Sequence, residues 1–263
     1  MKKHLYIITG ASRGMGLAMA QQLMQSDTAL LCISRNVEAS LTAVAAAQGT
    51  SLEQWPLDLD HGLEAAAMLT QWLASRKPGS FASASLINNA AVLPRIVPLS
   101  QADATGLSKA LRVGLEAPMQ LTAAFLHGTE GWLDTMNAHD AQDFRRRVLN
   151  ISSGNGRRAM ASQAIYSAAK AGMDHFTRCL ALEEALKPQG ARVCSLAPGV
   201  VDTDMQTHLR AADVESFPDH GRFVDLKTHG QLSSPAHAAA QVLAYLARPD
   251  FGNNPVADVR DAA

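Results

Sequence analysis

The sequence predicts a doubly wound α/β fold, in which helices cover both faces of one parallel sheet. Short apolar runs alternate with longer Ala- and Leu-rich stretches of helical periodicity along the chain. Several of these runs are apolar throughout, as is typical of parallel strands that are buried on both faces. Strand–helix alternation of this kind indicates a parallel sheet with right-handed crossovers.

The apolar runs and the helical periodicity assign the elements in order. We expect strands over His4–Ile8, Ala29–Ser34, Leu52–Leu57, Ala84–Asn88, Arg147–Ile151 and Arg192–Leu196, and a short last strand near Pro255–Val259. We expect helices over Gly14–Gln25, Glu38–Ala47, His61–Ser75, Ala102–His127 (with a break), Gln163–Lys187 and Pro235–Ala247. Two segments, 128–144 and 202–232, fit neither pattern. The second contains Gly, Pro and His, and as a long irregular segment it is expected to cover a substrate pocket.

Length and composition favour a single domain over residues 1–263. The chain has 263 residues, of which 47% are hydrophobic and 18% charged, and no linker-like segment divides it. A formal net charge of −1 argues against nucleic acid or an anionic membrane as the main partner. Three cysteines without metal-type spacing predict neither a disulfide framework nor a metal site. No apolar run approaches the length of a membrane span. We therefore expect a soluble, cytoplasmic globular protein.

A glycine-rich turn directly follows the first predicted strand and opens the first helix. Its spacing is G-x-x-x-G-x-G, with glycines at positions 10, 14 and 16. Glycines permit a tight turn, and the free N–H groups of a helix N-terminus attract a pyrophosphate. The turn therefore predicts a Rossmann-type dinucleotide site, and a purely structural turn is the alternative. The residues expected to contact the cofactor here are Gly10, Ser12, Arg13, Gly14, Met15 and Gly16.

The end of the second predicted strand indicates which dinucleotide is bound. An NAD site needs an acidic side chain there to hold the ribose 2′-hydroxyl. This chain has Arg35 instead, and its first acidic residue is Glu38 in the following helix. Together with Arg13, Arg35 offers two guanidinium groups to a 2′-phosphate. We therefore expect NADP(H), the alternative being that Arg35 merely ends the strand in solvent.

Tyr166 and Lys170 lie four residues apart and hence on one face of a helix. A neighbouring cation stabilises a phenolate and is expected to lower the pKa of the tyrosine, which would let it exchange a proton near neutrality. Ser153 lies thirteen residues earlier, at the carboxyl end of a strand, where ligands gather in open α/β sheets. The three residues together predict a catalytic site.

Nearly the whole chain resembles the short-chain dehydrogenase/reductase family. The resemblance rests on the glycine turn, Asp58 after the third strand, Asn88-Asn89-Ala90-Ala91 after the fourth, the Ser153, Tyr166 and Lys170 set, and Pro198-Gly199 leading to Thr203. It implies that Tyr166 is the acid/base, that Ser153 orients and polarises the substrate carbonyl, and that Lys170 lowers the tyrosine pKa and binds the nicotinamide ribose. It also implies cofactor contacts from Asp58, Leu59, Asn89, Pro198, Gly199, Val200 and Thr203.

Two positions depart from the family pattern. Ala91 stands where the family usually has glycine, and Gly114 stands where a catalytic asparagine holds a water of the proton relay. The relay therefore has no assigned residue.

Further stretches, among them Leu182-Glu183-Glu184, residues 197–206 and residues 223–227, narrow the resemblance. Within the family, they make the chain similar to sepiapterin reductases and benzil-type diketone reductases. This similarity implies an NADPH-dependent carbonyl reductase for vicinal diketones or pterin side-chain carbonyls, with Gly199 and Asp258 beside the substrate. Asp258 would anchor a pterin ring, or it merely ends the last strand. A non-catalytic NADP(H)-sensing scaffold and an epimerase or dehydratase are the alternatives. The resemblance further implies a homodimer or homotetramer built on the two long helices.

Overall fold

In the computed structural model, which describes residues 2–262, seven parallel strands form one sheet. The strand order is β3-β2-β1-β4-β5-β6-β7. The bounds are β1 Lys3–Thr9, β2 Thr28–Ser34, β3 Ser51–Pro56, β4 Phe81–Asn88, β5 Arg145–Ile151, β6 Arg192–Ala197 and β7 Val256–Asp258. All seven predicted strands are present, and the doubly wound fold is confirmed. The order reverses between β1 and β4, where open α/β sheets bind ligands at the carboxyl ends of their strands.

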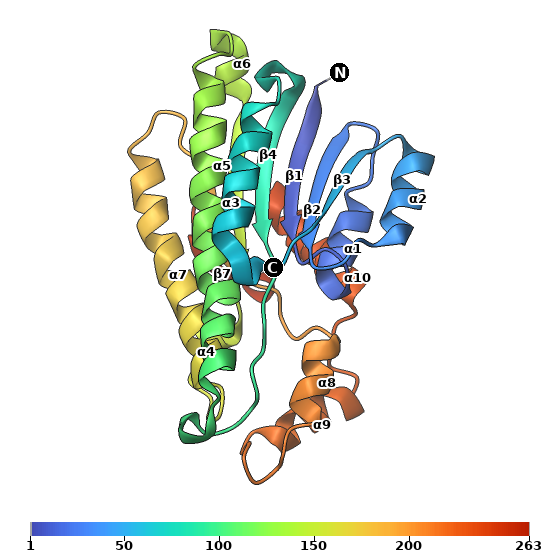
Figure 1. The fold of residues 1–263 in the computed structure, drawn as a ribbon, viewed down its shortest axis with the longest axis vertical. Helices are drawn as coiled ribbons and strands as arrows, with labels where there is room; N and C mark the ends of the chain where they lie inside the picture. Colours follow the sequence, from blue (N-terminus) through green and yellow to red (C-terminus); the bar gives the residue numbers. More distant parts are fainter. Residues whose placement is uncertain (1, 263) are drawn as a thin grey trace.

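Helices cover both faces of the sheet (Figure 1). The helices are α1 Gly14–Gln22, α2 Ala39–Gln48, α3 Gly62–Ala74, α4 Ala104–Leu111, α5 Ala117–Leu133, α6 Ala138–Asp143, α7 Ala164–Ala185, α8 Asp204–Arg210, α9 His220–Thr228 and α10 Pro235–Ala247. Short 3-10 turns occupy Leu59–His61, Pro78–Ser80, Leu99–Gln101, Gly154–Gly156 and Val259–Ala262. Within residues 2–262, no helix combines the length and apolar character needed to cross a membrane.

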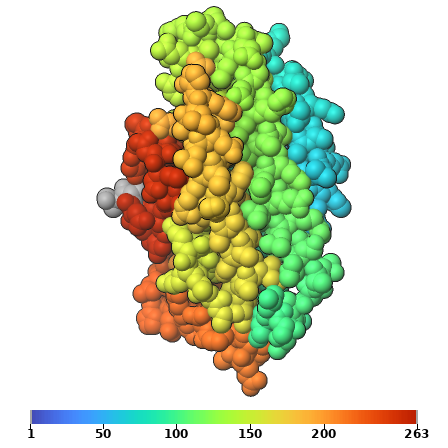
Figure 2. All heavy atoms as spheres, turned by 90° about the vertical axis from the view of Figure 1, so that its left-hand side faces the viewer, coloured from blue at the N-terminus to red at the C-terminus, as the bar shows by residue number. Residues whose placement is uncertain are grey.

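Neighbouring residues of β1 point to opposite sides and enter two separate apolar cores. Ile7 joins the core under α3, α5 and α7, whereas Ile8 joins the core under α1, α2 and α10. This alternation follows from the two-residue repeat of a strand. Figure 2 shows α5 and α7 running side by side on the surface of the molecule, where they cover the first of these cores.

The prediction that residues 128–144 are irregular is wrong. Helix α5 continues through Gly128 to Leu133, and α6 follows it. A Cβ on Gly128 would lie 2.9 Å from the Cβ of Leu73, so glycine lets α5 approach α3 closely. Trp132 is buried by this approach and stacks on Phe81, with ring centroids 5.3 Å apart. The apolar partners of this segment belong to β4 and α3. The polar composition of the segment itself therefore did not reveal that it is a packed helix.

The long helix predicted over 102–127 is interrupted as expected, by a π-helical turn over Arg112–Glu116. The Ala117 N–H donates to the Arg112 carbonyl, five residues back. Segment 202–232, expected to be irregular, contains α8 and α9 instead. These two helices extend beyond the carboxyl edge of the sheet (Figure 1) and have their own small apolar cluster around Phe217 and Phe223.

Replacing Trp132 tests the packing of α5 against β4. Trp132→Ala is expected to lower the free energy of unfolding by about 3–5 kcal/mol, because it removes a buried aromatic side chain and leaves a cavity. Leu186→Ala is the matched control, since Leu186 is 88% exposed. Urea unfolding monitored by circular dichroism measures both changes, and equal small losses would contradict the assigned packing.

Candidate active site

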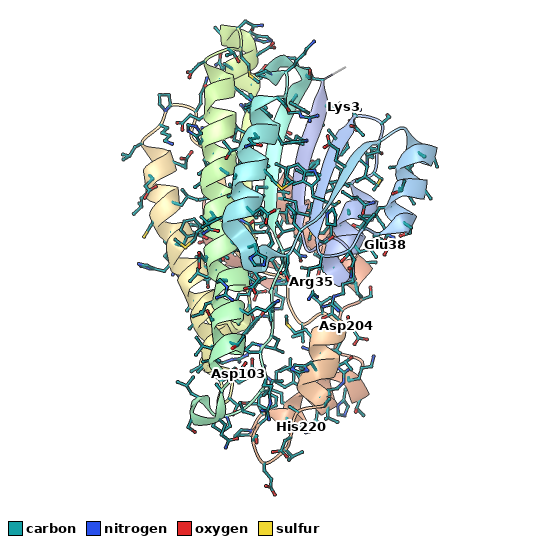
Figure 3. The ribbon with its side chains drawn as sticks, viewed as in Figure 1. Lys3, Arg35, Glu38, Asp103, Asp204 and His220 are labelled. Carbon is teal, nitrogen blue, oxygen red and sulfur yellow. The ribbon has the colours of Figure 1, made fainter. Side chains whose placement is uncertain are left out.

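A cavity of about 760 Å³ opens at the carboxyl edge of the sheet. Its walls come from the glycine turn, the ends of β2, β4, β5 and β6, and the helices α8 and α9. Figure 3 shows Arg35 at this edge of the sheet, above α8, where Asp204 is labelled. Every residue predicted to contact cofactor or substrate lies on the cavity wall except Asp258.

The glycine turn has the geometry that close approach to a ligand requires. Gly10 and Gly14 have φ values of +70° and +55°, a conformation that favours glycine. A Cβ on Gly16 would lie 2.2 Å from the Gly10 carbonyl oxygen, so a side chain there would break the turn. Asn89 supports the turn from β4, because its Nδ2 donates to the Thr9 carbonyl at 3.0 Å and to the Gly10 carbonyl at 3.3 Å. The turn therefore leaves the start of α1 open to a pyrophosphate.

The two arginines predicted at the 2′-phosphate lie in different surroundings. Arg35 is exposed and lines the cavity. Arg13 also lines it, but its Nη1 bonds Asp204 Oδ2 at 2.8 Å across the cavity mouth. Asp58 bonds Lys109 Nζ at 3.2 Å. Sequence reasoning missed Lys109, because its helix lies far along the chain and only the crossover brings it to β3.

The predicted catalytic residues converge on the cavity from two elements. Ser153 follows β5, and its Oγ accepts the Asn155 N–H at 3.2 Å, which leaves its proton free to be donated. Tyr166 and Lys170 come from the first two turns of α7. The Lys170 Nζ lies 5.7 Å from the centroid of the Tyr166 ring and donates to the Ile151 carbonyl at 2.7 Å.

Burial dominates the ionisation of both α7 groups. It raises the pKa of Tyr166 to about 12, with a smaller opposite effect from the Ser153 hydroxyl. It also lowers the pKa of Lys170 to about 8, with a smaller opposite effect from the Asp174 carboxylate. The predicted lowering of the tyrosine pKa by Lys170 is therefore wrong for this structure: burial raises this pKa, the group that opposes the rise is the Ser153 hydroxyl, and the Lys170 Nζ is bonded to the backbone of β5.

A buried carboxylate that the sequence analysis missed ties these elements together. Asp174, 1% exposed, lies one turn after Lys170. Its Oδ1 accepts the hydroxyls of Ser152 at 2.5 Å and Ser195 at 2.6 Å, and its Oδ2 accepts Arg157 Nε at 3.2 Å. The i, i+4 spacing from Lys170 was the available signal. The carboxylate joins α7 to the ends of β5 and β6.

Asp258 lies behind the cavity wall. Its Oδ2 bonds Arg260 Nη2 at 2.5 Å, and its Oδ1 accepts Arg260 Nε at 2.8 Å and the Arg260 backbone N–H at 3.0 Å. Arg260, which sequence reasoning missed, lines the cavity in its place. The hydrogen bonds from the Arg260 guanidinium are the main reason why the pKa of Asp258 lies below its usual range.

Gly114 lies within the π-helical turn, packed against α7. A Cβ at this position would meet the Cβ of Ala169 at 3.4 Å, and Ala169 precedes Lys170. Single π turns inside α-helices often mark functional sites. The turn therefore stands beside the lysine where the family pattern has its asparagine, and it presents only backbone there.

Four of the remaining predicted contacts, Pro198, Gly199, Val200 and Thr203, lie after the end of β6. Gly199 has a φ of +79°, and Thr203 approaches the glycine turn, because a Cβ on Gly14 would meet the Thr203 Cγ2 at 3.4 Å. Met15, Leu59, Pro198 and Val200 also line the cavity. Over residues 2–262, no group of three or more His, Cys, Asp or Glu side chains is arranged to hold a metal ion.

Comparison with known sequences decides the family. The profile of the short chain dehydrogenases matches residues 4–214. The chain belongs to the short-chain dehydrogenase/reductase family. This dehydrogenase is 34% identical to a benzil reductase ((S)-benzoin forming) of Bacillus cereus over 93% of its length and 94% of the relative's. It is 29% identical to the sepiapterin reductase of Bos taurus over 98% of its length and 94% of that protein's.

Solved structures share the architecture of this dehydrogenase. A short-chain dehydrogenase/reductase from Burkholderia vietnamiensis has 30% identity and a TM-score of 0.61, covering 98% of this chain and 99% of the other. The KRED1-Pglu enzyme has 24% identity and a TM-score of 0.78, covering 97% and 100%. The protein is therefore an oxidoreductase of a family that uses NAD(P)(H) and acts on small molecules.

Burial of Lys170 predicts a pH dependence of stability. Its pKa is about 8 in the folded chain against an ordinary 10.5, so the unfolded chain binds more protons between these values. The free energy of unfolding of the wild type is therefore expected to rise, relative to that of Lys170→Met, as the pH increases from 8 to 10. Urea unfolding at pH 7, 8, 9 and 10 measures the difference. Parallel curves for the two proteins would contradict the burial of a titrating ammonium.

Proposed function

We propose that the protein is an NADPH-dependent carbonyl reductase that acts on vicinal diketones. The observation that carries the proposal is the convergence of Ser153, Tyr166 and Lys170 on the cavity that the glycine turn also lines. The similarity to a benzil reductase over almost the full length of both chains supports the substrate class. The apolar side chains on the cavity wall, among them Leu93, Leu209 and Phe223, suit an aromatic or aliphatic diketone.

Each catalytic residue has a role that follows from its surroundings. When bound, the nicotinamide supplies the hydride that reduces the ketone carbon. The Ser153 hydroxyl, whose oxygen already accepts the Asn155 N–H, donates to the substrate carbonyl and orients it. Tyr166 donates a proton to the oxygen as negative charge develops on it. A pKa of about 12 keeps the phenol protonated at neutral pH, which suits a general acid and thus the reductive direction.

Lys170 provides positive charge beneath the tyrosine ring. Its ammonium donates a hydrogen bond to the Ile151 carbonyl and is stabilised by the negative charge of the buried Asp174 carboxylate. Protein groups, not water, therefore hold it in position. A cation at this distance stabilises the phenolate that forms when Tyr166 loses its proton. The same ammonium would bind the nicotinamide ribose.

The cavity wall supports NADP(H) over NAD(H). No carboxylate follows β2 where an NAD site would hold the ribose 2′-hydroxyl, and the exposed Arg35 occupies this end of the strand. Arg13 would join it, provided that its ion pair with Asp204 opens. Asp58 and Leu59 would flank the adenine, Asn89 the adenosine ribose, and Val200 and Thr203 the carboxamide.

Two other functions are less well supported. A non-catalytic NADP(H)-sensing scaffold would not need the Ser153, Tyr166 and Lys170 arrangement. An epimerase or dehydratase would use the same site without net consumption of cofactor.

A pterin substrate is also less well supported. To be anchored by Asp258, it would have to displace Arg260, which already bonds both carboxylate oxygens.

We further expect a cytoplasmic protein that pairs with copies of itself through α5 and α7. These helices lie side by side on one face (Figure 2), and Met119, Leu182 and Leu186 are exposed on them. Gly172, in contrast, packs within the chain, because a Cβ there would meet Leu115 Cδ2 at 2.9 Å. Segment 202–232, with α8 and α9, would cover the bound substrate.

Removal of one hydroxyl tests the general acid. Tyr166→Phe is expected to bind NADPH normally but to reduce benzil about 10²–10⁴-fold more slowly, because the proton donor is lost. NADPH fluorescence measures binding, and loss of absorbance at the nicotinamide band measures turnover. Tyr6→Phe in β1 is the matched control. A Tyr166→Phe rate within twofold of the wild type would contradict the assignment.

Replacing Arg35 tests the cofactor. Arg35→Gln is expected to raise the KM for NADPH about tenfold or more, because a charge-assisted contact to the 2′-phosphate is lost, and to leave the KM for NADH unchanged. Steady-state kinetics with the two cofactors and one diketone give both values. An equal effect on NADPH and NADH would overturn the NADP(H) preference.

A further inference from the structure

The part of the cavity wall that comes from α8, α9 and the segments after β5 and β7 carries an excess of positive charge. Its wall includes Arg158, Arg210, Arg222, Lys227 and Arg260. The carboxylate on this part of the wall is Asp202, which bonds Lys227 Nζ at 2.6 Å and lies 4.0 Å from Arg210 Nη2. Asp204 also lines the cavity, but its partner is Arg13 of the glycine turn. The cations therefore outnumber the carboxylates that could neutralise them.

Asp258 cannot supply a free negative charge to this part of the cavity. Its side chain is 8% exposed and holds Arg260 through both oxygens. Arg157 adds a second guanidinium from the other side, since its Nη2 bonds the carbonyl of the adjacent Ala257 at 2.8 Å. The Asp258 carboxylate is thus close to the guanidinium groups of Arg157 and Arg260. Arg260, not Asp258, lies on the cavity wall.

Arg158 and Arg222 are exposed, and among the described residues neither is paired with a carboxylate. Arg158 is fixed close to the catalytic serine, because its backbone N–H donates to the Gly154 carbonyl at 2.9 Å. Arg222 lies on α9 next to Phe223, which belongs to the same apolar cluster as Met160. Both arginines, from the loop after β5 and from α9, line the same cavity as apolar residues of this cluster.

These arginines are separate from the predicted 2′-phosphate site. Arg13 and Arg35 lie after β1 and β2, whereas Arg158 follows β5. Two strands separate β2 from β5 in the sheet, a distance of roughly 14 Å at the usual strand spacing. Arg158 thus lies on the Ser153 side of the cavity, away from Arg35.

We infer that the diketone reduced by this protein carries a carboxylate, held by Arg158 and Arg222 while its apolar body packs on Leu93, Met160 and Phe223. The inference rests on the proposed carbonyl reductase function and narrows its substrate class. A carboxylate matches the bidentate donor geometry of guanidinium groups. The N–H donors on the aminopyrimidine edge of a pterin, in contrast, would meet Arg260, which offers only donors and no acceptor.

A matched pair of substrates tests this inference. The value of kcat/KM is measured with NADPH for 4-carboxybenzil and for its methyl ester, which differ in charge but share the diketone. The double variant Arg158→Gln/Arg222→Gln is expected to lower the value for the carboxylate about tenfold or more and to change that for the ester by less than about twofold. Added salt is expected to weaken the carboxylate reaction selectively in the wild type.

Arg145→Gln, at the opposite end of β5, is the control and should leave the ratio of the two values unchanged. Unfolding midpoints verify that the variants are folded. Reduction of both substrates with a ratio that the double variant does not alter, or a rise in the KM for NADPH in place of the substrate effect, overturns this inference alone. If the wild type reduces neither compound nor benzil, the proposed function itself fails.

Discussion

The buried carboxylate of Asp174 is the interaction on which the geometry of the active site depends. It accepts hydrogen bonds from serines at the ends of β5 and β6, and it lies one helical turn from Lys170. Burial of a charge is costly unless that charge is paired and hydrogen-bonded. Two hydroxyls, Arg157 and the nearby ammonium meet this requirement together. The first turns of α7, which carry Tyr166, are thereby fixed against β5, the strand that Ser153 follows.

The same burial explains the protonation states in the site. Desolvation keeps the Tyr166 phenol neutral and brings the pKa of Lys170 toward neutrality. A neutral phenol is ready to give a proton to a developing alkoxide, whereas a phenol with a low pKa would suit proton removal from an alcohol. This protonation state is consistent with the proposed role of Tyr166 as the general acid, in which Lys170 would stabilise the phenolate that forms.

The cavity combines two recognition surfaces with different charge patterns. At the β1 and β2 side, glycines and two arginines face the region proposed for the dinucleotide phosphates, and Arg13 already has an anionic partner in Asp204. At the β5 side, α9 and the loop after Ser153 contribute an apolar patch bordered by arginines. Arg260, paired with Asp258, lies on the wall in place of the acid.

The sequence alone determined the fold, the glycine turn and the positions of Ser153, Tyr166, Lys170 and Arg35, because these features depend on local periodicity and on the end of a strand. Tertiary structure decided the helical state of residues 128–133, the pairing of Asp258 with Arg260 and the roles of Lys109 and Asp174. Each of these depends on partners far along the chain or across the sheet. The tyrosine pKa belongs with them, because burial raises it and the four-residue spacing does not reveal how deeply a side chain is buried.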